Sequence, residues 1–158
     1  MDADHDRVQE VDQMLFASKL NAEMRKASVR SGHQLTDIAR EAIGAGARGV
    51  GATDHGEGDT GCQPVATAVA YAATRVSTEQ AVASDMFAFA VSFVGAALRL
   101  RLTDHRHAQV VLRAVGPVIA DATDDAVGRA LEDMGGCVPL ADVMSAQHER
   151  AEARLFAS

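Results

Sequence analysis

Apolar residues recur at intervals of three and four along most of the chain, which is the period of an α-helix. The first such segment carries Val8, Val11, Met14 and Leu15. The same period returns over about residues 22–43, 64–74, 78–101, 105–131 and 139–156. No stretch alternates apolar and polar residues as a half-buried strand does. The pattern predicts an all-α fold, a single-domain bundle of about six to seven helices over residues 1–158 with no β-sheet.

Three local signals refine this prediction. Ser77 followed three positions later by Gln80 is a capping-box pattern for the helix over 78–101. The pair Gly116-Pro117 predicts a break or kink, because proline removes a helical hydrogen bond. Gly32 lies inside a predicted helix, where glycine costs about 1 kcal/mol relative to alanine. Gly32 therefore predicts either a kink or the close approach of another backbone.

The helix over 22–43 is expected to turn one apolar stripe towards the core. That stripe consists of Met24, Ala27, Leu35, Ile38 and Ala42.

Two segments are expected to lie outside the helical pattern. Residues 1–7 are polar and acidic and are expected either to fray, as chain ends commonly do, or to form the solvated start of a helix. Residues 44–61 read GAGARGVGATDHGEGDTG and predict a flexible surface loop, since glycine loses the most entropy on ordering. The run GAGARG matches GxGxxG, but a helix precedes it and more glycine follows. A loop therefore explains it better than a dinucleotide site, which requires a preceding strand.

Composition narrows the class of protein. The formal net charge of −7 argues against a nucleic-acid or anionic-membrane partner, because either needs a basic surface. The chain opens with no basic region followed by an apolar run, so we expect a cytoplasmic protein. Cys62 and Cys137 are too few for a disulfide framework and are expected to be buried, reduced thiols.

The most apolar run is MFAFAVSFVGAAL, residues 86–98. It is shorter than the roughly 20 residues that a membrane-spanning helix needs. The run therefore predicts a buried core helix or a dimer-interface helix, with Met86, Phe89 and Phe93 as its principal contacts.

Candidate chemistry is sparse. Four residues are weak metal-ligand candidates: Asp54, His55, His105 and His107. The acidic loop lacks the framework of a calcium-binding loop, and two histidines two positions apart do not share a helix face. Solvated or locally hydrogen-bonded imidazoles are the favoured interpretation. No GxSxG motif occurs and neither cysteine has a neighbouring histidine, so no catalytic residue is predicted.

Three blocks in order carry a resemblance to a known family. They are SKLNAEMRKASVRSGHQL, DMFAFAVSFVGAALRLRLTDHRHAQVVL and the closing SAQHERAEARLFAS. The first resembles a helix with the pattern R-x-x-S-x-x-x-G-x-x-L, and the last resembles H-E-x-x-x-x-R-L-F-x-S. Together they are similar to the urease accessory protein F family (UreF) over about residues 8–158.

The resemblance implies an all-helical, non-enzymatic adaptor that forms a homodimer. Such an adaptor binds the accessory protein UreD (also called UreH), recruits the GTPase UreG and helps to deliver nickel to the urease apoprotein. No cofactor is implied beyond transient Ni²⁺. Residues 148–158 correspond to a partner-docking tail, with partner contacts at His148, Glu149, Arg154, Leu155 and Phe156. Arg99 falls where the family has a surface lysine that tunes the GTPase interaction.

The chain also departs from the family pattern. It lacks an N-terminal segment that members normally carry, so we expect a truncated chain, an alternative start or a shortened homologue. Gln63 replaces a family histidine, and Glu152 replaces the usual tyrosine of the tail. Three alternatives remain beside the adaptor: a nickel-binding chaperone module that uses the acidic loop and the two histidines, a shortened paralogue with only a structural or dimerisation role, and a small enzyme.

Overall fold

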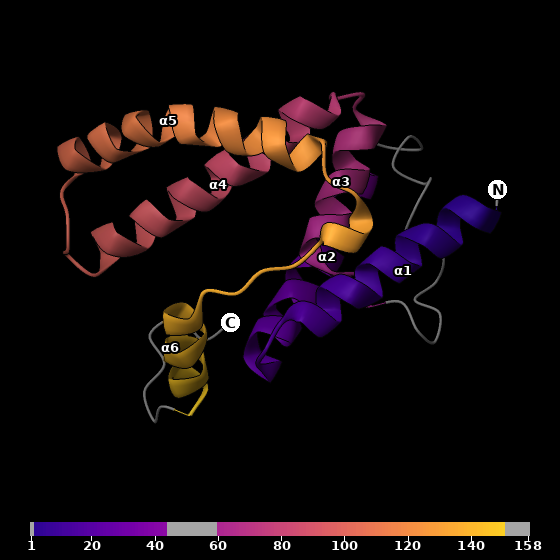
Figure 1. The fold of residues 1–158 in the computed structure, drawn as a ribbon, viewed down its shortest axis with the longest axis horizontal. Coiled ribbons are helices and arrows are strands. Elements are labelled where there is room, and N and C mark those ends of the chain that lie inside the picture. Colours follow the sequence, from indigo (N-terminus) through magenta and orange to yellow (C-terminus); the bar gives the residue numbers. More distant parts are fainter. Residues whose placement is uncertain (1, 44–59, 151–158) are drawn as a thin grey trace. The chain divides into compact units, whose positions relative to one another are not determined.

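The computed structural model describes residues 2–43 and 60–150, with side chains from residue 5 onward. These residues form six α-helices and one short 3-10 helix, and none of them lies in a strand (Figure 1). The helices are α1 (Asp2–Ser18), α2 (Ala22–Ile43), α3 (Gln63–Ala73), α4 (Thr78–Arg99), α5 (His105–Val127) and α6 (Pro139–Glu149), with η2 (Leu131–Asp133) between the last two. The predicted all-α fold is confirmed. The GAGARG run and most of the predicted glycine-rich loop lie outside the described residues.

Contacts divide the chain into two compact units. One comprises Met1–Arg75 with Gly135–Ser158, and the other comprises Val76–Met134. The first unit therefore contains α1, α2, α3 and α6, whereas the second contains α4, α5 and η2. A single domain over residues 1–158 stays a prediction.

In the first unit, α2 and the start of α3 meet at Gly32. A Cβ atom on Gly32 would overlap the carbonyl oxygen of Gly61 and would lie 2.9 Å from the carbonyl carbon of Cys62. Ser28, one turn earlier, accepts a hydrogen bond from the Gln63 N–H at 3.3 Å. The close backbone approach predicted from Gly32 is therefore confirmed.

This contact also corrects the predicted inward stripe of α2. Met24 and Ile38 are 44% and 62% exposed, whereas Gly32 and Ala39 are buried. Gly32 and Ala39 lie seven positions apart and so share a helix face. Because the smallest side chains permit the closest packing, α3 lies against this face, and the larger apolar residues are rotated to one side.

Asp12, in the middle of α1, anchors the start of α3. It is only 2% exposed, and its carboxylate accepts hydrogen bonds from the Thr60 hydroxyl and from the Gly61 and Cys62 N–H groups, the latter two at 2.7 Å. Burial alone would raise the pKa of Asp12, but these hydrogen bonds together hold it below its usual value. The carboxylate satisfies N–H groups at a helix start that have no intrahelical acceptor.

The second unit is a hairpin in which α4 and α5 run side by side (Figure 1). Val94 and Ala108 are buried at 8% and 2% exposure. The predicted capping box is confirmed, since Ser77 and Gln80 exchange both hydrogen bonds. At the start of α5 the Asp104 side chain accepts hydrogen bonds from the Arg106 and His107 N–H groups. Side-chain caps therefore fix the position at which each of the two helices of the hairpin begins.

α1 begins at Asp2, so residues 2–7 form the polar start of the first helix, and fraying of this end stays a prediction. Two further predictions are wrong in part. α5 runs through Pro117 as a single helix without the predicted break, and the alternative of a kink at this position stays a prediction. Cys62 is buried as predicted, but Cys137 is exposed. Cys137 lies between η2 and α6, where no other element covers it.

Candidate interaction surface

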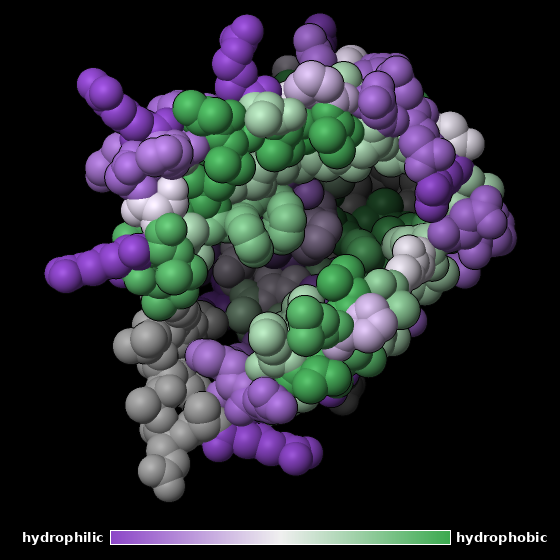
Figure 2. Space-filling view, turned by 60° about the vertical axis from the view of Figure 1, so that its left-hand side comes forward, coloured by the Kyte–Doolittle hydropathy of each residue, from purple (hydrophilic) through white to green (hydrophobic). Residues whose placement is uncertain are grey.

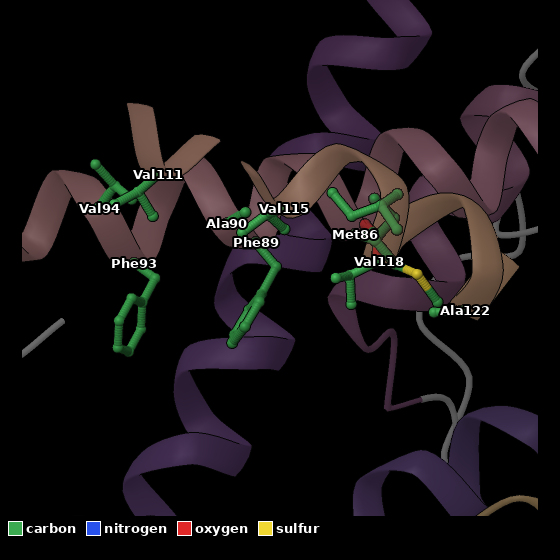
Figure 3. A pocket seen from close by; sticks show the side chains of 11 residues that line it. Met86, Phe89, Ala90, Phe93, Val94, Val111, Val115, Val118 and Ala122 are labelled. Carbon is green, nitrogen blue, oxygen red and sulfur yellow. The ribbon is translucent and has the colours of Figure 1, made fainter. Parts of the chain in front are cut away.

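An apolar groove of about 510 Å³ lies along the α4–α5 hairpin (Figure 3). Both helices contribute to its lining, which consists of Asp85, Met86, Phe89, Ala90, Phe93 and Val94 from α4 with Val111, Val115, Val118, Ile119 and Ala122 from α5. Asp85 is the one ionisable residue among them. The groove therefore suits an apolar surface or helix and offers almost no charge for a polar ligand.

Phe89 and Phe93 stand at the groove with most of their surface uncovered. They are 73% and 69% exposed, and their ring centroids are 6.4 Å apart. Figure 3 shows both rings projecting in the same direction from α4, as the spacing of four residues requires. Met86 lies deeper, with its sulfur 4.0 Å from the Thr123 hydroxyl. Covering each ring would contribute about 1.5–3 kcal/mol.

The interpretation of α4 as a buried core helix is wrong for Phe89 and Phe93. Phe87 and Val91 are also exposed, at 47% and 43%, on a different side of the helix. α4 is apolar around more than half of its circumference, and a single neighbouring helix cannot cover that much surface. The alternative interpretation, an interface helix, stays a prediction. Figure 2 shows hydrophobic residues, in green, at the surface that this view presents.

α4 is also the one helix of the described residues that is long and apolar enough to cross a membrane. Only 6% of its most apolar stretch is buried. These criteria are length and composition alone, and an interface helix can satisfy both. The helix therefore does not by itself identify a membrane span.

The predicted partner-binding residues fall in three places. Arg99 ends α4 and is exposed, and His148 and Glu149 end α6. The His148 ring nitrogen Nδ1 lies 3.2 Å from the Glu23 carboxylate of α2. Arg154, Leu155 and Phe156 lie outside the described residues, so their role in docking stays a prediction.

The weak metal-ligand candidates do not form a site in the part of the chain that the structure describes. His107 pairs with Asp104 at 2.7 Å, and the hydrogen bonds from its N–H and its ring hold the pKa of Asp104 below the usual value. A locally hydrogen-bonded imidazole is therefore the correct interpretation of His107. No group of three potential ligands gathers among the described residues. Asp54 and His55 lie outside them.

Sequence reasoning missed the two polar contacts that organise the first unit. One is the Asp12 cluster, and the other joins Asn21 and Glu23 to α6. An aspartate in an amphipathic helix, such as Asp12, is normally interpreted as a residue on the solvated face. One signal was available, because Asp12 lies four positions after Val8 and three before Leu15 and so falls on the apolar face of the first helix. The partners are about 50 and 125 residues away, and no local pattern identifies them.

These features define an all-α protein with an uncovered apolar helix surface. The sequence matches the family model UreF over residues 1–116, and the chain belongs to this family, whose curated relatives are urease accessory proteins. The chain is 28% identical over 154 residues to urease accessory protein UreF 1 of Brucella melitensis biotype 1. The aligned residues make up 97% of this chain and 64% of that relative. Urease accessory protein UreF 2 of Brucella canis is also 28% identical, and the aligned residues make up 97% of this chain and 63% of that relative.

A shorter match covers part of the chain. UreF of Brucella ovis is 30% identical over 95 residues, which are 60% of this chain and 42% of that relative. The chain thus spans less than two thirds of the length of the relatives it matches. No solved structure matches it.

Proposed function

We propose that this protein is a non-catalytic adaptor in urease assembly. In this role it bridges UreD (UreH) and the GTPase UreG, acts as a homodimer in the cytoplasm and assists nickel insertion into the urease apoprotein. Family membership over residues 1–116 carries the proposal. Nickel is the cargo of the assembly, and its contact with this chain is transient.

The α4–α5 groove supports an adaptor role on physical grounds. A protein that acts by assembling others needs apolar area that stays uncovered until a partner arrives. Phe89 and Phe93 supply such area, and aromatic side chains commonly dominate the energy of protein interfaces. We assign these two residues, with Met86, to the dimer contact.

The tail supplies the second part of the proposal. We assign residues 148–158 to docking on UreD, with Leu155 and Phe156 as apolar anchors and His148 and Glu149 at its start. Arg154 and Arg99 are assigned to the recruitment of UreG. A tail that orders on binding loses conformational entropy, so its apolar anchors must contribute most of the affinity.

Co-purification of the full-length chain with UreD and UreG tests these assignments. Deleting residues 149–158 is expected to abolish capture of UreD, whereas Arg154→Ala is expected to reduce capture of UreG and leave UreD bound. Arg30→Ala is the matched control, since Arg30 is an exposed arginine of α2 outside the tail, and it is expected to leave capture of both partners unchanged. Unchanged capture of both partners by the deleted chain would overturn the tail assignment.

A further inference from the structure

The turn that joins α4 to α5, at the left of Figure 1, departs from what local stability favours. Its hydrogen bonds form a Schellman motif, a common C-terminal cap of a helix. The Leu102 N–H donates to the Ala97 carbonyl at 2.9 Å, and the Arg101 N–H donates to the Leu98 carbonyl at 3.0 Å. Arg101 has a φ of +57°, the left-handed conformation that this motif requires and that glycine adopts at the lowest cost. The chain therefore has an arginine where glycine would be more stable.

The apolar residues of this turn are uncovered. The residue that follows the left-handed position of a Schellman motif commonly packs against the last turns of the preceding helix. Here that residue is Leu102, which is 76% exposed, and Leu100 at the end of α4 is 45% exposed. Two large apolar side chains thus stand at the end of the hairpin without full cover from either of its helices.

The charges of α5 oppose its helix dipole, which favours acidic residues at the N-terminal end and basic residues at the C-terminal end. After the N-cap Asp104, the first turn contains no acidic residue and carries Arg106. The last turn contains no basic residue and carries Asp124 and Asp125. Arg101 and Arg106 are both exposed, and neither forms an ion pair among the described residues. These two arginines therefore lower the stability of the helix ends at which they lie.

The turn is also basic within an acidic chain. Residues 99–113 contain four arginines and one aspartate, which gives +3 with histidine neutral, whereas the formal net charge of the whole chain is −7. Residues that break local rules of stability at one place are typical of functional surfaces. An extended anionic membrane or nucleic acid would also face the acidic remainder of the chain, which repels it. A compact acidic segment of a polypeptide meets only the turn, and we therefore favour it.

From these observations we infer that the turn between α4 and α5 is a docking surface for an acidic polypeptide segment that has apolar residues between its carboxylates. We call this surface the basic turn, and it consists of Leu100, Arg101, Leu102 and Arg106. The two arginines pair with carboxylates of the segment, and its apolar residues cover the two leucines. The inference concerns the basic turn alone and requires neither the dimer nor the partners proposed above.

Fluorescence anisotropy of the full-length chain with a labelled peptide of alternating glutamate and leucine residues tests the inference. We expect saturable binding that weakens as salt is added, because salt screens exposed charges. The double substitution Arg101→Gly with Arg106→Gln should weaken binding at least about tenfold, since two charge-assisted contacts are lost. The same variant should have a higher melting temperature than the wild type, because glycine fits the left-handed position and a cation leaves the start of α5. Weaker binding would then not result from a damaged fold.

The matched control is Arg75→Gly with Arg30→Gln. Both arginines are exposed, and Arg75 has a φ of +59° at the end of α3, so the control repeats the loss of charge and the change at a left-handed position. It should leave binding of the peptide unchanged.

Four results would overturn the inference. They are the absence of saturable binding, an equal loss of binding in the control, equal binding of a peptide with glutamine in place of glutamate, and tighter binding to vesicles of phosphatidylcholine and phosphatidylserine than to the peptide. The measurement contains neither UreD nor UreG, so failure of the adaptor proposal would leave these binding constants unaffected.

Discussion

Asp12 shows how much one residue can organise. Its carboxylate joins α1 to Gly61 and Cys62, the two residues that directly precede α3. The same contact isolates Cys62, whose side chain is completely buried. Burial, and then the neighbouring Asp12 charge, raises the pKa of the Cys62 thiol, so this cysteine is expected to be neutral and unreactive.

We expect Asp12→Asn to destabilise the protein by about 2 kcal/mol at neutral pH, because hydrogen bonds to a charged acceptor are replaced by weaker ones. The pKa of Asp12 in the folded state lies below its usual value of 3.8. Its contribution is therefore complete above that value and is lost as the pH falls through the folded-state pKa. Urea denaturation from pH 7 to pH 2 measures this, and the variant should lack that part of the acid dependence. Asp6→Asn, an exposed change on the same helix, should have little effect.

Gly32 gives a second prediction at the scale of one residue. In a helix, Gly→Ala normally stabilises by about 0.5–1 kcal/mol. At Gly32 the added methyl group would meet the backbone of Gly61 and Cys62, so we expect a loss of at least about 2 kcal/mol. At Gly95 the nearest atom is an Arg99 nitrogen at 3.5 Å, and the normal gain is expected. Thermal denaturation of the two variants should give shifts of opposite sign, and shifts of the same sign would contradict the packing at Gly32.

At the scale of elements, α5 is the helix in which local signals and structure disagree. Pro117 has no N–H to donate to the preceding turn, yet the helix continues from His105 to Val127. α5 lies along α4, with Ala108 buried before Pro117 and Thr123 buried after it, and the Thr123 hydroxyl lies 4.0 Å from the Met86 sulfur of α4.

Pro117→Ala should therefore stabilise the α4–α5 hairpin by about 1–3 kcal/mol, since the interior proline costs roughly that amount. Pro139→Ala is the matched comparison. Pro139 lies in the first turn of α6, where no hydrogen bond is lost, and a change within about 0.5 kcal/mol is expected. Guanidinium denaturation followed by circular dichroism measures both. A destabilised Pro117 variant would show that the proline supports the groove rather than straining the helix.

For the whole molecule, the exposed groove has a consequence for assembly. If the chain dimerises through α4, Phe89→Ser with Phe93→Ser should weaken the dimer at least about tenfold, because each protomer would lose two buried rings. Phe87→Ser, on another side of the same helix, is the matched control. Analytical ultracentrifugation over a range of concentrations measures the effect. A wild type that stays monomeric throughout, or a control that dissociates as fully as the double variant, would remove α4 from the dimer contact.

The sequence alone determined the helices, their approximate bounds, the capping box at Ser77 and the family. These follow from local spacing of apolar residues, from short-range hydrogen bonds and from motifs that are contiguous in the chain. The close backbone approach at Gly32 was also predictable from the sequence, because glycine inside a helix usually marks close packing or a kink.

Only the tertiary structure decided which helix faces are covered. The smallest residues of α2, Gly32 and Ala39, form its buried face, whereas Phe89 and Phe93 stay uncovered. Asp12 pairs with residues 60–62, and hydrogen bonds join α6 to α2. The physical reason is common to all four. Each depends on the shape and distance of partners that lie far away in the chain, and helical periodicity identifies an apolar stripe without stating what will pack against it.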